Sequence, residues 1–286
     1  MAEKDLVQRT LESYEDVFAD IVNVLIWNGE RKVLEKDLSD ADPVSTYKAD
    51  KKVRWQGRDV CKYWKNNEVR IAFCGFENQT LPDADMPLRV IGYDGASYRA
   101  QLKGKERYPV ITLVLYFGRK HWKKNTRLHE RIGISDELKP FVNDYKVNII
   151  EVSYLSDKQI SMFQSDFRFL ADMMVQKRKN KNYEPPEGQI KHTEAILDAI
   201  SVFSGDSRYR ELINEGFDAE GVNMCEIYDS IEKKGIKEGI KEGRLEMCEE
   251  NIRKLMKNAS LSVDEAMNLL GIKGKTRTTM KKAIQG

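Results

Sequence analysis

The sequence lacks a long hydrophobic run, and none of its apolar segments approaches the roughly 18 residues that a membrane-spanning helix needs. The stretch MAEKDLVQRT lacks the apolar centre of a secretory signal peptide. Only four cysteines and three histidines are present, and neither set has the spacing of a metal site or a catalytic pair. We therefore expect a cytoplasmic protein with free thiols, no membrane association, and neither cysteine nor histidine chemistry.

A strong net charge is also missing, since the formal value is +2, which is too small by itself to indicate a nucleic-acid-binding protein. Basic residues instead gather in three runs: Arg119, Lys120, Lys123, Lys124 and Arg127 around Trp122; Lys177, Arg178, Lys179 and Lys181; and Lys273, Lys275, Arg277, Lys281 and Lys282. Each run can contact phosphates, and each can equally be a solvated face. The candidates for DNA contact are Lys120, Lys123 and Lys124 from these runs, together with Arg89 and Tyr93.

What the sequence does contain is a hairpin pattern. Two strand-like runs, RDVCKYW and VRIAFCGF, flank the polar turn KNNE. Asp59 opens the first strand, and Glu77 with Gln79 closes the second. A turn centred between residues 67 and 68 places Asp59 opposite Phe76, one residue from Glu77, and allows Cys61 to face Cys74. Because opposite side chains lie about 5 Å apart and diagonal ones about 7–8 Å, Asp59 and Glu77 can share one ion after a small distortion of the ladder.

The segments around the hairpin predict helices and further strands. An apolar stripe predicts a helix over 11–27, with Asp20 at the border of the stripe, where it is either a surface carboxylate or part of a site. Residues 30–52 predict a loop with a short helical turn. Asp83 or Asp85, followed by Pro87, begins a helix over 85–103, with Arg89 and Tyr93 on one face toward the acids. Strands are predicted at 109–118 and 146–155, and a helix at about 157–177.

This order of elements predicts an α/β fold with a mixed sheet covered by helices. Composition divides the chain into a domain over 1–179, a linker over 180–189 and a helical C-terminal region over 190–286. Gly235, Gly239 and Gly243 recur in a charged helical run, which can form a homodimer contact or a frayed helix. The final segment begins a helix at Ser262 and is compatible with a helix-turn-helix DNA reader or an ordinary helical hairpin.

Hydrolysis of a phosphodiester requires a divalent cation, an activated water and relief of charge at the phosphate. Hard cations such as Mg²⁺ prefer oxygen ligands, which Asp59, Glu77 and the carbonyl of Asn78 can supply. A lysine usually orients the attacking water, and here Gln79 takes that place. A neutral amide can hydrogen-bond the water, but it cannot offset negative charge.

The wider sequence resembles the PD-(D/E)XK nucleases, and in particular the bacterial Rpn-type recombination-promoting nucleases and putative transposases. The matching residues are FADI, RDV, GFENQT…DADMPLRVIGYDGASYRAQ, YPVITLVLYFG, VNDYKVNIIEVSYL and FQSDFRFL. The resemblance covers most of 10–180 and implies a restriction-endonuclease-like core and cleavage of DNA that depends on Mg²⁺, with Mn²⁺ as a substitute, linked to transposition or recombination. It also implies that Asp59 and Glu77 are the motif acids and Gln79 the lysine equivalent, with Asp20, or else Asp16, as a further acid from the helix.

Two functions follow as hypotheses. The first is a Mg²⁺-dependent DNA endonuclease. The second is a DNA-binding or assembly protein whose nuclease core is inactive, which the replacement of lysine by Gln79 and the small net charge favour.

Overall fold

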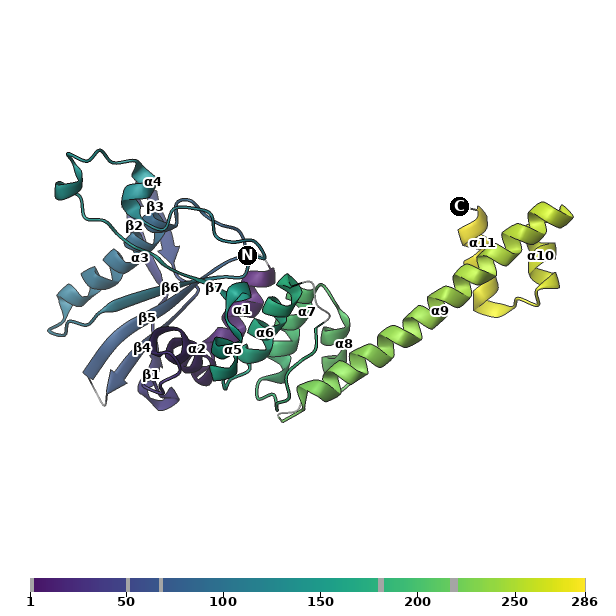
Figure 1. Ribbon diagram of the computed structural model, residues 1–286, viewed down its shortest axis with the longest axis horizontal. Coiled ribbons are helices and arrows are strands. Elements are labelled where there is room, and N and C mark those ends of the chain that lie inside the picture. The colour runs from purple at the N-terminus through teal and green to yellow at the C-terminus, as the bar shows by residue number, and fades with distance from the viewer. Residues whose placement is uncertain (1–2, 50–51, 67–68, 180–182, 217–220, 286) are drawn as a thin grey trace. The chain divides into compact units, whose positions relative to one another are not determined.

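The computed structural model describes residues 3–49, 52–66, 69–179, 183–216 and 221–285, and a five-stranded sheet lies at its centre (Figure 1). The strands are β1 (Leu38–Asp40), β4 (Val60–Asn66), β5 (Val69–Gln79), β6 (Val110–Tyr116) and β7 (Asn148–Glu151). They lie in the order β1-β4-β5-β6-β7. The pairs β1–β4 and β4–β5 are antiparallel, whereas β5–β6 and β6–β7 are parallel. A second sheet pairs β2 (Val44–Ala49) with β3 (Lys52–Gly57).

Helices cover both faces of the central sheet (Figure 1). The α-helices between residues 3 and 214 are α1 (Glu3–Ser13), α2 (Glu15–Trp27), α3 (Met86–Ala100), α4 (Leu128–Ile132), α5 (Asp157–Met162), α6 (Phe167–Arg178), α7 (Thr193–Ser204) and α8 (Arg208–Asn214). Short 3-10 turns are η1 (Glu35–Asp37), η2 (Gln101–Lys103), η3 (Lys139–Phe141) and η4 (Val152–Tyr154). The predicted α/β fold, with its mixed sheet, flanking helices and helical C-terminal region, is confirmed.

Alternation along β5 directs successive side chains to different helical layers. Phe76 stacks on Phe18 of α2, with ring centroids 4.3 Å apart. Val114 of β6 packs on the other face, in a buried cluster with residues of α3. Because Glu77 pairs in register with Val114, the Glu77 side chain lies on the α3 face. The next side chain, that of Asn78, therefore lies on the face covered by α1 and α2.

The hairpin forms as predicted, but its register changes by one residue. Close to the turn, Lys65 pairs with Arg70, and beyond a bulge between Trp64 and Lys65 the partner of Val60 is Phe76. The expectation that Asp59 faces Phe76 is therefore wrong for the Cα pairing, although the Asp59 amide still donates to the Phe76 carbonyl over 2.9 Å. The extra residue shifts the pairing, so that Asp59 lies one position further along β5, toward Glu77. This is the small distortion of the ladder that we expect if the two acids share an ion.

The same shift separates the two cysteines of the hairpin. Cys61 pairs with Gly75, and Cys74 pairs with Lys62, so the two thiols do not lie in directly opposed positions. Both cysteines are buried and free. The expectation of free thiols is confirmed for this pair.

Two predicted helices are each divided in the structure. The helix predicted over 11–27 breaks at Tyr14, whose extended backbone (φ −65°, ψ 133°) separates α1 from α2. The helix predicted at 157–177 divides into α5 and α6. The predicted loop at 30–52 contains η1 as its helical turn, but it also contributes β1 and β2. A three-residue edge strand is too short to show periodicity, so pairing with β4 rather than local pattern defines β1.

The chain forms two compact units, Met1–Ile227 and Tyr228–Gly286. The predicted linker at 180–189 therefore lies within the first unit, and its residues 180–182 lie outside the described part. Helix α7, which follows this segment, contacts α1 and α6. The division between units falls instead within the long helix α9 (Met224–Ala259).

The second unit contains most of α9 together with α10 (Val263–Leu269) and α11 (Gly274–Gln285). Its core joins Ile252 of α9, Met267 of α10 and Met280 of α11. The helix predicted from Ser262 is confirmed, because Ser262 and Glu265 form a reciprocal capping box. Within the described ranges, no helix combines the length and apolar character needed to cross a bilayer.

Candidate functional site

The carboxyl end of β5 and the residue that precedes β4 bring Asp59 and Glu77 together. Both Asp59 oxygens have partners: the Asn78 amide donates to Oδ2 over 2.7 Å, and Arg9 of α1 donates to Oδ1 through Nε over 2.7 Å and through its terminal nitrogen. The Asp59 side chain keeps 10% of its exposure. A backbone amide and a part-exposed arginine thus hold the Asp59 carboxylate in place.

Glu77 is the more buried acid, with only 4% of its side chain exposed. Its Oε1 pairs with Arg89 of α3 and accepts from Nε2 of Gln79 over 3.3 Å. Its Oε2 has no hydrogen-bond partner in the described structure. Burial raises the pKa of Glu77 to about 7 against the opposing effect of Arg89, and the charge of Asp59 raises it further. The two carboxylates therefore lie close enough for the charge of Asp59 to act on Glu77.

Glu12 of α1 is a third acid in this region, and the sequence reasoning missed it. It is buried, and its Oε2 accepts from Nδ2 of Asn78 over 2.8 Å. Burial raises the pKa of Glu12 to about 8, and the charge of Asp59 raises it too. Glu12 Oε1 and Asn78 Oδ1 are buried without partners among the described residues. Only the position of Glu12 in the first turn of the helix predicted over 11–27 could have indicated it.

The structure does not bring Asp20 to Asp59 and Glu77. Its Oδ1 accepts from Arg31 over 2.7 Å, and its Oδ2 accepts from the amides of Gln164 and Ser165 over 2.8 and 2.7 Å. Asp20 therefore accepts hydrogen bonds from backbone amides in the segment that connects α5 to α6. The backbone break at Tyr14 explains the difference, because it gives the residues of α1 and those of α2 different orientations. Asp16, the second choice for the helix acid, is bound instead to Lys191 and His192.

Arg89 and Tyr93 of α3 lie on the helix face that meets Glu77. Arg89 donates to Asp83 over 2.9 Å as well as pairing with Glu77, and its Nε donates to the Tyr93 hydroxyl over 3.2 Å. Burial and the charge of Glu77 raise the pKa of Tyr93. Asp85 precedes α3 and Pro87 lies in its first turn, which is the start signal read from the sequence.

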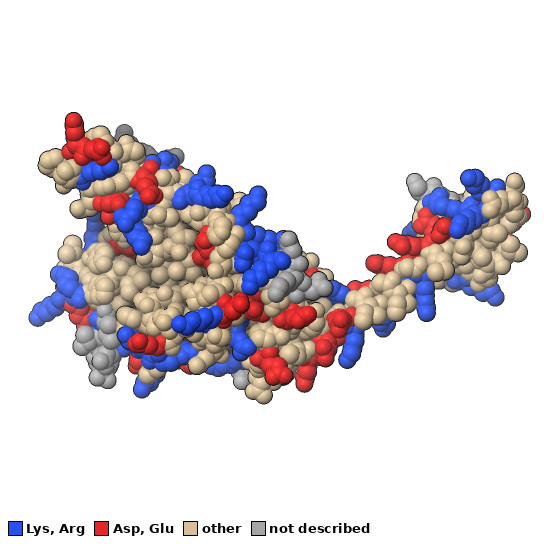
Figure 2. Space-filling model, in the orientation of Figure 1, with Lys and Arg blue, Asp and Glu red and all other residues tan. Residues whose placement is uncertain are grey.

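The first basic run follows β6 beside this site. Arg119, Lys120 and Lys123 line a pocket of about 560 Å³, and Lys124 is exposed nearby in the chain. Basic and acidic side chains are interspersed over the visible face of the molecule (Figure 2). In the second run, Lys177 and Arg178 donate to the carbonyls of Ser204 and Ser153. Lys181 of the same run lies outside the described residues. In the third run, Arg277 and Lys281 pair with Asp264.

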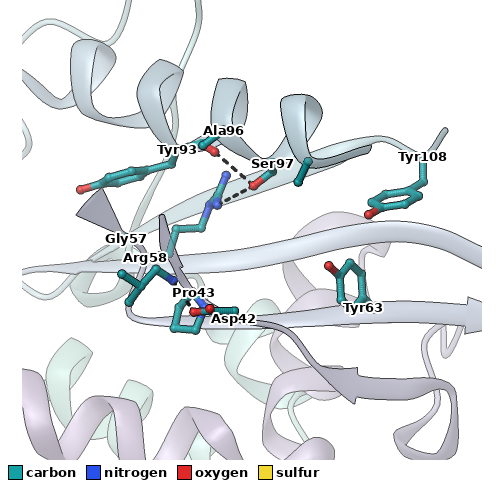
Figure 3. Close-up of a pocket in the computed structure, with 11 residues that line it drawn as sticks. Asp42, Pro43, Gly57, Arg58, Tyr63, Tyr93, Ala96, Ser97 and Tyr108 are labelled. Atoms are coloured by element: carbon teal, nitrogen blue, oxygen red, sulfur yellow. Dashed lines mark hydrogen bonds between the residues drawn. The ribbon is translucent and has the colours of Figure 1, made fainter. Parts of the chain in front are cut away.

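A separate polar network ties α3 to the sheet behind the acids. Arg58 reaches from the chain before β4 toward α3, where it donates to Ser97 over 3.1 Å (Figure 3). It also donates to Thr112 over 2.7 Å and pairs with Asp94, which accepts from Thr112 and Tyr145 as well. A Cβ at position 75 would lie 2.3 Å from the Arg58 side chain, so a glycine is required there. The network positions the helix that carries Arg89 and Tyr93.

An oxygen on the α3 face of the acid site fits a divalent cation: Glu77 Oε2 is unpartnered in the described structure, and the pKa of Glu77 is raised. Glu12 Oε1 and Asn78 Oδ1 are also unpartnered among the described residues, but they lie on the opposite face of β5. A nearby cation lowers the pKa of a carboxylic acid and satisfies such oxygens. No group of three or more His, Cys, Asp or Glu side chains among the described residues has the arrangement of a ready metal site.

Comparison with known proteins identifies one family. The family model described as "Putative transposase, YhgA-like" matches residues 36–192, which is more than half of the chain and includes Asp59, Glu77, Gln79 and Arg89. No curated protein and no solved structure gives a significant match.

Proposed function

Because the chain belongs to the family of YhgA-like putative transposases, we propose that it is a metal-dependent DNA endonuclease with a PD-(D/E)XK site of the Rpn type. The observation that carries the proposal is the placement of Asp59 beside Glu77 at the ends of adjacent strands, where the charge of Asp59 raises the pKa of Glu77 and Glu77 Oε2 is buried without a described partner. Two acids this close repel each other, and in the described structure each is neutralised by an arginine whose place a cation can take. The proposed setting is a cytoplasmic protein that acts in transposition or recombination.

Asp59, Glu77 and the Asn78 carbonyl would hold the cation, which is Mg²⁺ with Mn²⁺ as a substitute. When bound, such an ion polarises the phosphate and lowers the pKa of a bound water. Arg9 and Arg89 neutralise Asp59 and Glu77 in the described structure. Both arginines are more than one third exposed, so their flexible side chains can turn from the acids to a phosphate oxygen.

Gln79 completes the site on the α3 face. Its Nε2 already reaches Glu77 Oε1, and its amide can orient a water for attack on phosphorus. Glu12 lies on the other side of Asn78, where its Oε2 accepts from Asn78 Nδ2 over 2.8 Å. Glu12 acts on the reaction through Asn78 and Asp59, which makes it a positioning residue.

The direct test is cleavage of supercoiled plasmid by the purified full chain with Mg²⁺ or Mn²⁺. Asp59→Ala and Glu77→Ala should each lower nicking by at least about 100-fold, equivalent to roughly 2.7 kcal/mol of transition-state stabilisation. Asp136→Ala is the matched control, since its side chain is 91% exposed and pairs only with Lys139 among the contacts described. Cleavage that survives both substitutions would contradict the assignment.

Gln79 also favours a second function, a DNA-binding or assembly protein without cleavage. The neutral amide stands where a lysine usually neutralises charge, and arginines already occupy Asp59 and Glu77. This function predicts DNA retention that weakens steeply with salt and no nicking with either metal. Gln79→Lys then separates the two functions, because it should restore nicking only if the remaining site is intact. A homodimer through the C-terminal helices is part of either proposal, and sedimentation of the full chain tests it.

A further inference from the structure

The pocket beside Gln79 has the form of a site for one flat ring and its phosphate. It begins at Thr80, which follows Gln79, and includes Tyr116, the register partner of Gln79 on β6. Its volume of about 560 Å³ lies in the usual range for small-ligand sites, about 300–1,000 Å³. Leu81 and Pro82 supply an apolar wall. The pocket therefore adjoins the proposed cleavage site without sharing its acids.

Two of the residues that line this pocket, His121 and Tyr154, belong to a stack of three side chains. The His121 and Tyr154 rings are stacked with centroids 3.7 Å apart, and the Arg178 guanidinium lies 4.4 Å from the Tyr154 centroid. Since one stacked ring covers one face of Tyr154, Arg178 must occupy the other. His121 is then the outer layer of the stack, and 58% of its side chain is exposed. Its Nδ1 is 3.0 Å from Glu151, which fixes the plane of the ring.

Charge around the pocket is positive. Arg119, Lys120 and Lys123 contribute to its lining, and each is exposed. Glu151 contacts the stack, and both of its oxygens are already bound, to His121 and to the amide of Trp122. Gly118 leaves room for the Tyr116 ring in this pocket, because a Cβ at position 118 would collide with the Tyr116 hydroxyl. An apolar wall, an exposed imidazole ring and three exposed cations complement a nucleobase joined to phosphate.

We infer that this pocket binds an unpaired nucleotide of the DNA strand, with the base stacked on His121 and the adjoining phosphates contacted by Arg119, Lys120 and Lys123. The inference rests on the proposed function, because it names the substrate class of the same site. A base within a duplex is stacked on its neighbours and cannot enter a pocket, whereas an unpaired base has a free face. The preferred substrate is therefore DNA with a single-stranded segment next to the cleavage position.

Binding of the full chain to two DNA probes tests this site. One probe is a blunt duplex, and the other is the same duplex with a single-stranded thymidine tail that contains one 2-aminopurine. Measured by fluorescence anisotropy in metal-free buffer, the tailed probe should bind about tenfold more tightly, the size expected of one stacked base. The 2-aminopurine fluorescence should be quenched on binding. Equal affinity for the two probes would overturn the inference.

Single-residue variants test whether His121 is responsible for the preference for the tailed probe. His121→Ala should remove the preference for the tail and the quenching, with little change for the blunt duplex, whereas His121→Phe should keep both. Phe141→Ala removes an aromatic ring that is 85% exposed in η3 and should change neither probe. An equal loss for both probes in His121→Ala, or an RNA tail bound as tightly as the DNA tail, would also overturn the inference. Because binding is read without metal, loss of this preference is distinguishable from failure of the plasmid-cleavage test.

Discussion

Two clusters of buried charged side chains contact the same sheet: the network of Arg58 and Asp94, and the acid site. They differ in how many of their polar atoms have hydrogen-bond partners. In the network of Arg58 and Asp94, both oxygens of Asp94 accept hydrogen bonds, and Arg58 donates to three different side chains. In the acid site, Glu12 and Glu77 each keep one buried oxygen without a partner in the described structure. Paired, hydrogen-bonded charges hold a fold together, whereas unsatisfied ones point to a ligand or a reaction.

The second difference lies in what each arginine can do. Arg58 is 3% exposed and enclosed by its partners, but Arg9 and Arg89 are 36% and 38% exposed. A buried ion pair cannot reorganise without leaving a charge unpaired, whereas a part-exposed arginine can move into water. The network is therefore suited to support α3, and the acid site is suited to exchange its arginines for a cation and a phosphate.

The largest expected effect on stability comes from breaking the satisfied network. Arg58→Ala leaves Asp94 buried without its cation, which should lower the free energy of unfolding by about 3–5 kcal/mol. Urea unfolding followed by circular dichroism measures this change. Arg99→Ala, which removes an exposed arginine from the same helix, is the control and should change stability by less than about 0.5 kcal/mol. A loss of stability no larger in Arg58→Ala than in Arg99→Ala would mean that the network does not support the fold.

In the acid site, by contrast, removing a charge should raise the stability of the metal-free protein. Glu12 has a folded-state pKa of about 8, raised by burial from 4.5, so folding favours its protonated form. Its contribution to stability is complete below pH 4.5 and is lost as the pH rises through 8. Glu12→Gln keeps an acceptor for Asn78 without a charge, and it should stabilise the metal-free protein by roughly 2 kcal/mol at pH 8 and hardly at pH 4.5.

Unfolding of wild type and Glu12→Gln across this pH range, in the presence of a chelator, measures the difference. Glu30→Gln changes an acid that is 69% exposed and should give no pH-dependent gain. A Glu12→Gln variant that is less stable than wild type at pH 8 would show that Glu12 is a satisfied structural acid like Asp94.

The smallest effect should come from removing one hydroxyl group at the edge of the network. Ser97 accepts from Arg58 over 3.1 Å and donates to the Tyr93 carbonyl, so Ser97→Ala should cost about 1 kcal/mol of stability. Ser161→Ala removes an exposed serine that bonds its own helix and serves as the control. Thermal unfolding measures both variants. If Ser97→Ala costs as much as Arg58→Ala, the network is one cooperative unit rather than an ion pair with a supporting hydroxyl.

Much of the candidate site was predictable, because its signals are local. The two strands around the turn, the acids at their ends and the helix that begins after Asp85 all follow from short patterns of apolar and polar residues. The side of β5 shared by Glu77 and Gln79 also follows, since strand side chains alternate. The roles of Asp59, Glu77 and Gln79 in catalysis, and of the basic residues in DNA contact, remain predictions.

The sequence by itself determined four of the five segments of the mixed sheet, all but the edge strand β1, and the acids at the end of its hairpin, because periodicity and turn residues act over a few neighbours. Only the tertiary structure decided the bulge that moves Asp59 toward Glu77, the break at Tyr14 that brings Glu12 rather than Asp20 to the site, and the pocket beneath His121. These depend on which distant groups become buried together, and burial is set by packing between elements that local patterns do not describe.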